Sequence, residues 1–259
     1  MAEKFKENAQ VMKQECIGTG IYSMWLKTEK IAGAARSGQF VSVYCTDGSR
    51  LLPRPISICE IGEDKKSLRL VYRVAGKGTG EFAKAKAGDV FQVLGPLGNG
   101  FPLERCPEGK TAFLIGGGIG IPPMLELSKQ LKGNKMAVLG YRDERFLDEE
   151  LSNYADVYIA TEDGSMGTKG NVLDAIKAHG LKADVIFACG PTPMLRALKA
   201  YAEEEGIECW LSLEERMACG VGACLGCVCH SKEIDDHSKV HNKRVCKDGP
   251  VFLSTEVVL

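Results

Sequence analysis

Four cysteines near the carboxyl end of the chain have the spacing of a metal-cluster site. Gaps of four and two residues separate the first three, and the fourth follows after a further 18 residues. They are Cys219, Cys224, Cys227 and Cys246. This is the plant-type spacing of [2Fe–2S] ligands. The first three thiolates then come from one loop curled around the cluster, where Gly220, Gly222 and Gly226 relieve steric crowding.

Zinc is the alternative metal for this segment. His230, His237 and His241 lie close by, and thiolates also suit Zn²⁺. Zinc sites are usually built from two short paired knuckles, however, which this spacing does not resemble. Cys229 is a further thiol that either lies beside the cluster or replaces Cys227 as a ligand. The spacing favours a [2Fe–2S] cluster bound through Cys227.

Cysteine usage also bears on the compartment. The chain has 11 cysteines, an odd number, and its first 15 residues alternate in charge without the apolar stretch of a secretory signal. Five of the 11 lie between residues 219 and 246, where a uniform distribution would place roughly one. We therefore expect no disulfide framework and a cytoplasmic location.

A second group of residues, in the first half, is suited to a phosphate-containing cofactor. An extended strand offers a guanidinium that can pair with phosphate and a hydroxyl that can reach a ring nitrogen. A glycine turn then offers backbone amides and a hydroxyl to a pyrophosphate. The residues are Arg54, Pro55, Ile56, Ser57, Val71, Tyr72, Arg73, Gly76, Gly78 and Thr79. A proline-broken edge strand and a hairpin turn are the plainer interpretation of each motif alone.

A third group is glycine-rich and follows apolar runs in the second half. Glycines let a diphosphate approach the backbone, and the proline after them suits the first turn of a helix. The candidates are Gly116, Gly117, Gly118, Gly120, Cys189 and Gly190. Ile121 stands where the third glycine of G-x-G-x-x-G would be, so a classical Rossmann dehydrogenase is disfavoured.

Acidic residues after two of these runs could select the nicotinamide cofactor. Asp143, Glu162 or Asp163 could accept a ribose hydroxyl, which would favour NAD over NADP. Cys189 has two interpretations, a residue beside the nicotinamide or a small buried side chain.

The segments that would position these groups show three different sequence patterns. Short β-like runs at 21–28, 39–46, 54–61, 68–75 and 90–95 predict an antiparallel barrel or sandwich over residues 1–103, with one short helix near 79–86. Apolar runs at 111–117, 135–141, 156–161 and 184–190 alternate with helix-like stretches at 124–131, 171–178 and 193–206. This predicts an α/β domain with a mostly parallel sheet over 104–209. Residues 210–259 predict a small loop-rich module held by metal.

Charge and hydropathy exclude other classes. The formal net charge is -1, which leaves no basic field for nucleic acid. The longest uncharged stretch, 111–125, is 15 residues, whereas a membrane span needs about 20. No nucleophile–base motif is present, so we expect no catalytic side chain beyond the cofactor sites.

The ordered set of motifs resembles the ferredoxin-reductase family. The residues that carry the resemblance are RPIS at 54–57, GKGT at 76–79 and GPLG at 95–98. The resemblance implies that the R-x-x-S strand holds FAD, with Ser57 near the reactive ring edge. It also implies a looser glycine turn followed by proline for NAD, and a place for Cys189 near the nicotinamide.

The order of the three parts, together with ERMACGVGACLGCVC at 215–229, resembles the electron-transfer subunits of B-type, NAD-linked dihydroorotate dehydrogenase. This resemblance covers nearly the full length. It implies that electrons pass from the FMN of a separate catalytic subunit through the [2Fe–2S] cluster and FAD to NAD⁺, in a heterotetramer with two copies of each chain that serves pyrimidine biosynthesis.

Two other functions stay open at this point. Reductase subunits of cytoplasmic hydrogenases and of flavin-bifurcating ferredoxin:NADP transhydrogenases have a similar architecture but a different partner. A redox-sensing or zinc-stabilised binding module without turnover belongs to another class.

Overall fold

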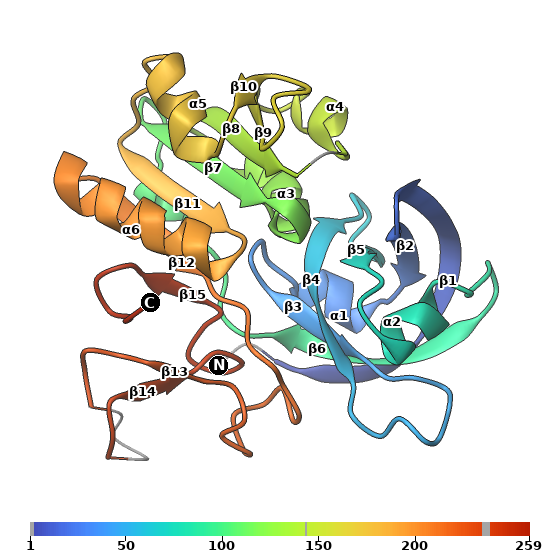
Figure 1. Cartoon of the computed structure of the whole chain (residues 1–259). Helices are drawn as coiled ribbons and strands as arrows, with labels where there is room; N and C mark the ends of the chain where they lie inside the picture. The colour runs from blue at the N-terminus through green and yellow to red at the C-terminus, as the bar shows by residue number, and fades with distance from the viewer. Residues whose placement is uncertain (1–2, 143, 235–238) are drawn as a thin grey trace.

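The first six strands of the chain close into an antiparallel barrel (Figure 1). The structure is a computed structural model, and it describes residues 3–142, 144–234 and 239–259. The barrel order is β1-β2-β5-β4-β3-β6. Its strands are β1 (Phe5–Gly18), β2 (Ile21–Lys27), β3 (Phe40–Val43), β4 (Arg54–Ile61), β5 (Ser67–Arg73) and β6 (Val90–Leu97). The predicted barrel is confirmed.

Two helices accompany the barrel, α1 (Lys30–Ala34) and α2 (Lys77–Phe82). The second lies at the start of the helix expected near 79–86, whereas α1 and strand β1 were not predicted. Strand β1 escapes pattern recognition because charged and polar side chains occupy most of its positions, and only Ala9 and Val11 are fully buried. It pairs with β2 and β6 on its two sides and so completes the barrel.

Aromatic side chains fill the barrel interior. The ring of Phe82, at the end of α2, packs edge-on against Tyr72 at 6.0 Å and against Phe91 at 5.2 Å between centroids. The Tyr72 hydroxyl donates to Gln14 of β1 over 2.9 Å, and the Gln14 amide donates to the carbonyl of Phe82 over 2.8 Å. This core fixes α2, and the glycine turn before it, to the barrel wall.

The second half of the chain forms a seven-stranded sheet of order β10-β9-β8-β7-β11-β12-β15. All its pairings are parallel except that of β12 with β15. The strands are β7 (Thr111–Gly117), β8 (Asn134–Tyr141), β9 (Asp156–Thr161), β10 (Thr168–Lys169), β11 (Val185–Cys189), β12 (Glu208–Ser212) and β15 (Val251–Leu253). The mostly parallel sheet predicted from the alternating runs is confirmed.

Helices cover both faces of this sheet. They are α3 (Pro122–Gln130), α4 (Asp148–Leu151), α5 (Val172–Ala178) and α6 (Thr192–Glu205), with 3-10 turns η1 (Leu103–Arg105) and η2 (Gly118–Gly120). Alternate residues of β7 point to opposite faces, as strand geometry requires. Phe113 and Ile115 pack with α5 and α6, whereas Ala112 and Leu114 pack with α3, on the side of the barrel.

The carboxyl-terminal segment is divided between the sheet and a loop region. Strands β12 and β15 extend the sheet, so it takes in parts of residues 210–259, which the sequence analysis assigns to the cluster module. Between them lie the cysteine-rich loop and a two-stranded ribbon, β13 (Val228–His230) with β14 (Asn242–Arg244). Among the described residues, no helix has the length and apolarity needed to cross a membrane.

One asparagine connects the barrel to this last segment. Asn99, just after β6, donates through its side-chain amide to the carbonyl of Val251 over 2.7 Å and accepts from the Val251 amide over 3.0 Å. Its own backbone N–H donates to Gly249 over 2.6 Å. The side chain thus acts as one more strand residue beside β15.

We expect Asn99→Ala to lower the free energy of unfolding by about 1–3 kcal/mol, because the Val251 amide and carbonyl lose their partly buried partner. Urea titration followed by circular dichroism measures this. Asn8→Ala, at an exposed position of β1, is the control and should change the free energy by less than about 0.5 kcal/mol. Equal effects of the two substitutions would contradict this account of Asn99.

Candidate functional site

The cysteine loop directs backbone amides at its own sulfurs. The amides of Val221 and Ala223 donate to the Cys219 sulfur over 3.4 and 3.3 Å, and the Gly226 amide donates to the Cys224 sulfur over 3.4 Å. Such hydrogen bonds stabilise the thiolate form, in which cysteine binds iron. The loop therefore has the electrostatics of a site for a negatively charged sulfur cluster.

The four predicted ligands form two hydrogen-bonded pairs, Cys219 with Cys224 and Cys227 with Cys246. Burial raises the pKa of Cys219, but the amides of Val221 and Ala223 and the Cys224 thiol outweigh it and bring the value to about 6. Donation by the Cys246 thiol lowers the pKa of Cys227 to about 6 and raises that of Cys246.

This pairwise arrangement differs from a single-ion site. Within the described ranges, no three His, Cys, Asp or Glu side chains converge as they would around one metal ion. A [2Fe–2S] cluster has four cysteine ligands and two irons. Each iron can then take two of the four thiolates, which matches the two thiol pairs.

Cys229 lies apart from these pairs. It is in strand β13, partly buried against the core beneath the loop, and burial raises its pKa to about 11. His230 is exposed, and the ring of His241 contacts the carbonyl of Lys232 over 3.0 Å. His237 lies outside the described residues. These environments favour a packing role for the Cys229 thiol.

A buried arginine braces the loop from behind, and sequence reasoning did not single it out. Arg244 donates through Nη1 to the carbonyl of Gly222 over 3.2 Å and through Nε to Asp248 over 3.2 Å. Asp248 also accepts from the Arg244 backbone over 2.8 Å. Only the distance in sequence to Cys246, two residues, hinted at this contact.

The flavin candidates gather along β4 and the turn before α2. A Cβ added to Gly78 would lie 2.4 Å from Nε of Arg54, so this glycine lets the guanidinium lie directly on the turn. Arg54 also donates to the carbonyl of Leu52 over 2.5 Å. Pro55, Ile56 and Ser57 continue the strand, half-buried. A guanidinium held on a glycine turn is a suitable anchor for a pyrophosphate.

Other predicted flavin residues have contacts of their own. The Thr79 hydroxyl accepts from the amides of Ala75 and Gly76 over 2.9 and 3.2 Å, so it closes the turn. The Tyr72 ring lies inside the barrel, whereas Val71 packs with the core that the barrel shares with the α/β domain. Arg73 is exposed at the end of β5. Val71 therefore packs at the domain interface, whereas the Tyr72 ring does not.

The two glycine-containing turns of the α/β half touch each other. A Cβ on Gly120 would lie 2.2 Å from the Cys189 carbonyl oxygen, and a Cβ on Gly190 would lie 3.1 Å from the Gly117 amide. The turns follow neighbouring strands, since Cys189 pairs in register with Gly116. Gly118 has φ +51°, and a Cβ added to it would meet no other atom within 4 Å. The structure thus brings these candidates to one place at the carboxyl edge of the sheet, where α/β folds bind ligands.

Cys189 itself is protonated at neutral pH. Burial raises its pKa to about 12, despite the opposing hydrogen bond with Ser212 on the neighbouring strand β12. The thiol is therefore a neutral group within the turn.

A cleft of about 560 Å³ opens at the same edge, beside β8 and β9. It is lined by residues 144–150 together with Ser165 and Met166. Glu162 and Asp163 are exposed near it, and hydrogen bonds from Ser165 lower the pKa of Asp163. Asp143 lies outside the described residues. The cleft has the location expected for the far end of a dinucleotide.

The three candidate sites converge on the middle of the molecule. A Cβ on Gly220 of the cysteine loop would lie 3.0 Å from Oγ of Ser42, so the loop touches strand β3 there. Ser42 is the register partner of Pro55 on β4, and neighbouring strands are about 4.8 Å apart. On its other side the barrel meets the α/β half, where β5 contacts η2. No motif pointed to Ser42, because its contact with Gly220 exists only in three dimensions.

Comparison with known proteins agrees with this arrangement. Residues 214–258 match the family model described as the iron-sulfur cluster binding domain of dihydroorotate dehydrogenase B, which favours the cluster over zinc. The chain superposes with a TM-score of 0.85 on the structure of an NADH-dependent reduced ferredoxin-NADP oxidoreductase, a protein described in terms of flavin-based electron bifurcation. That chain is 29% identical, and the match covers 96% of this chain and 89% of that one.

A ferredoxin NADP⁺ reductase from Neisseria gonorrhoeae with bound FAD and NADP shares the fold, with a TM-score of 0.63 and 18% identity over 78% of this chain and 92% of that chain. Sequence relatives match over nearly the whole length. Proteins named dihydroorotate dehydrogenase B (NAD(+)), electron transfer subunit, from Bacillus mycoides and Bacillus cereus are 45% identical over 98% of this chain and 99% of their own. The chain therefore belongs to the family of electron-transfer subunits of dihydroorotate dehydrogenase B.

Proposed function

We propose that this chain transfers electrons to NAD⁺ from a partner subunit, as part of pyrimidine biosynthesis. The partner subunit oxidises dihydroorotate. The observation that carries the proposal is the convergence of three sites. Gly220 of the cysteine loop lies against Ser42, and Ser42 pairs with Pro55 of the flavin strand. The names of the 45% identical relatives supply the substrate and the cofactor NAD.

The division of labour follows the three parts predicted from the sequence. We assign FAD to residues 1–103, NAD to 104–209 and the [2Fe–2S] cluster to 210–259, although β12 and β15 of the last part join the sheet. Nicotinamide exchanges electron pairs, an iron–sulfur cluster passes single electrons, and flavin does both. The protein contributes the distances and orientations between them.

The chain's own groups then have separate tasks. Arg54 on the Gly78 turn neutralises a pyrophosphate, and Ser57 directs a hydroxyl at the flavin ring. The touching turns around Gly120 and Cys189 leave backbone amides for the dinucleotide phosphates. The thiolates of the cysteine loop, with amides aimed at Cys219 and Cys224, hold the cluster.

The partner is expected to dock over the cysteine loop. Cys224 is exposed there, and so are the apolar side chains of Val221, Leu225 and Val228. Exposed apolar side chains around a redox group are typical of a docking surface. We propose that this surface receives an FMN-containing catalytic subunit, with two copies of each chain in the complex.

A second function has one observation in its favour. The structural match at TM-score 0.85 is to an electron-bifurcating NADH-dependent ferredoxin-NADP oxidoreductase. A reductase subunit of that type would use the same cofactor sites with a different partner. The higher identity of the dihydroorotate dehydrogenase relatives, 45% against 29%, makes it the alternative.

The partner decides between the two functions. We expect the chain to co-purify with a flavin-containing subunit, and we expect orotate formation with NAD⁺ to require both chains. Omission of either chain is the control. Reduction of NADP⁺ by the isolated complex with NADH and reduced ferredoxin as electron donors, without any dihydroorotate oxidation, would establish the alternative.

Cysteine variants test the ligand set. The unmodified chain should contain about two irons and two sulfides. Cys246→Ser should lose or distort the cluster and keep the flavin, because a buried thiol of one pair is removed. Cys229→Ser is the matched control and should keep the iron, since its thiol packs against the core. Iron and sulfide analysis with visible absorbance measures both, and the opposite result would overturn the assignment.

Arg54→Met tests the flavin anchor. The variant keeps the aliphatic stem but loses a charge-assisted hydrogen bond, worth about 1.5–3 kcal/mol, so FAD should bind on the order of 10–100 times more weakly. Fluorescence titration of the flavin-free chain with FAD gives the dissociation constant. Arg36→Met, which removes an exposed arginine outside β4, should leave that constant unchanged. Unaltered FAD binding in Arg54→Met would contradict the assignment.

A further inference from the structure

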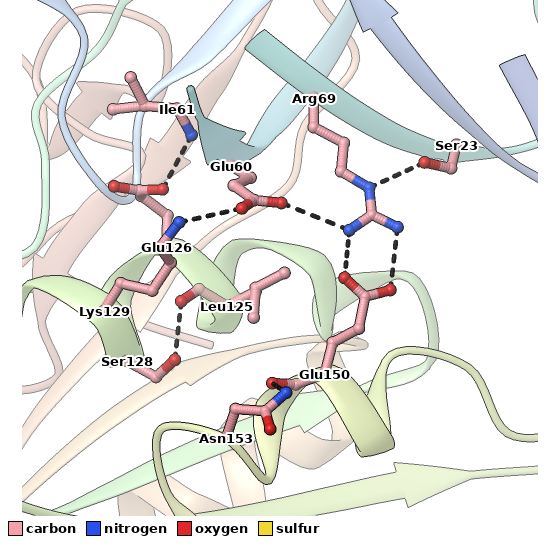
Figure 2. Close-up of polar contacts among 10 residues, drawn as sticks. All are labelled: Ser23, Glu60, Ile61, Arg69, Leu125, Glu126, Ser128, Lys129, Glu150 and Asn153. Carbon is pink, nitrogen blue, oxygen red and sulfur yellow. Dashed lines mark hydrogen bonds and ion pairs between the residues drawn. The ribbon is translucent and has the colours of Figure 1, made fainter. Parts of the chain in front are cut away.

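A group of charged side chains, most of them buried or half-buried, crosses the interface between the barrel and the α/β domain (Figure 2). We call it the interdomain clamp. Its members are Glu60, Arg69, Glu126, Lys129 and Glu150. Glu60 and Arg69 belong to strands β4 and β5 of the barrel, and the other three belong to helices α3 and α4. Of these residues, only Glu150 also lines the cleft beside β8 and β9.

Helix α3 attaches to the end of strand β4 through two contacts. Glu126 accepts the Ile61 amide over 2.8 Å, and Lys129 donates to Glu60 over 2.9 Å. The Glu126 side chain also accepts from Gln130 over 2.6 Å. Glu126 is only 5% exposed, so its carboxylate has exchanged water for these donors.

Helix α4 attaches to strand β5 through one arginine. Arg69 is 7% exposed and forms a two-pronged ion pair with Glu150, whose Oε1 lies 3.0 Å from Nη2. The same guanidinium reaches Glu60 at 3.3 Å and donates to the Ser23 hydroxyl over 2.8 Å. The fork geometry of this pair allows only one relative orientation of its partners.

The clamped elements run directly into the two cofactor sites. Strand β4 carries Ser57 three residues before Glu60, about 10 Å along an extended strand. Helix α3 begins at Pro122, after the glycine turn, and reaches Glu126 about 6 Å further along its axis. The clamp thus lies close to Ser57 and to the glycine turn before α3.

Apolar packing at the same interface has no comparable directionality. Ile21 and Val71 of the barrel share one core with Ile121 and Met124 of the α/β domain. Such a core stabilises the contact through the area it buries, which is non-directional. Buried ion pairs contribute little net stability, but they favour one arrangement over near neighbours.

We propose that the interdomain clamp holds the β4 strand and the glycine turn before α3 at the separation and angle needed for contact between flavin and nicotinamide. This inference rests on the proposed function and adds to it a set of positioning residues. A misplacement of about 1 Å at a reacting centre can cost on the order of 10²-fold in rate. The clamp therefore matters for the rate of electron exchange more than for the binding of either cofactor.

Lys129→Gln is the primary test, because Lys129 does not line the cleft beside β8 and β9 and the change removes its ion pair with Glu60. In the full chain purified with FAD, we expect an unchanged FAD content and an unchanged dissociation constant for NADH. We expect the rate of flavin reduction by NADH to fall about tenfold. The long-wavelength absorbance of the nicotinamide–flavin contact should weaken in parallel. Glu203→Gln, at an exposed glutamate of α6, is the control.

A second readout does not depend on cofactors. Hydrogen exchange of the segment containing the Ile61 amide should be faster in Lys129→Gln and in Glu150→Gln than in the unmodified chain, both without FAD. When the two substitutions are combined, their effects on the exchange rate should be less than additive, because both loosen the same clamp. Unchanged exchange in both single variants would overturn the proposal.

The kinetic outcomes separate this proposal from the proposed function. An unmodified chain that binds FAD but is not reduced by NADH would refute the proposed function, while the exchange measurement still tests the clamp. A Lys129→Gln variant that loses NADH affinity at an unchanged reduction rate would overturn the positioning role. Loss of FAD together with a lower unfolding midpoint would also overturn it, because the clamp would then be a structural brace.

Discussion

The contact between strand β4 and helix α3 is the constraint on which the arrangement of this protein depends. Strand β4 carries Ser57, helix α3 follows the glycine turn, and the last residue of β4, Ile61, meets Glu126 in the middle of α3. A strand and a helix are both stiff, because every residue is fixed by backbone hydrogen bonds. Their crossing therefore sets how the barrel presents a flavin to the sheet.

The third site is attached in a different way. The cysteine loop reaches the barrel through Gly220, which has φ +67° and leaves room for Ser42 and Leu97 at 3.0 and 3.1 Å from its would-be Cβ. Asn99 ties the following segment to the same end of the barrel. Backbone contacts of this kind give close approach without bulk, which suits a loop that has to bring a cluster near a flavin.

The interior of the loop suits anionic sulfur. Amides point at Cys219 and Cys224, and the Cys227 thiolate is stabilised by donation from Cys246. Metal binding generally requires deprotonated thiols, so a site that lowers their pKa releases fewer protons when it is filled. The bracing of Gly222 by Arg244 keeps the loop curled around the space between its sulfurs.

Local patterns in the sequence determined the kinds of elements and the chemistry they carry. Alternation identified strands β2 to β6, the change of period marked the α/β half, and the cysteine spacing indicated a [2Fe–2S] centre, because each of these signals is confined to a few neighbouring residues. Strand β1 escaped because polar and charged residues occupy most of its exposed positions. Tertiary structure alone decided that Gly120 touches Cys189, that Gly220 touches Ser42 and that Arg69 meets Glu150 across 81 residues. Such contacts depend on how whole strands and helices pack against one another. Neither the type of a residue nor its spacing along the chain therefore identifies its distant partner.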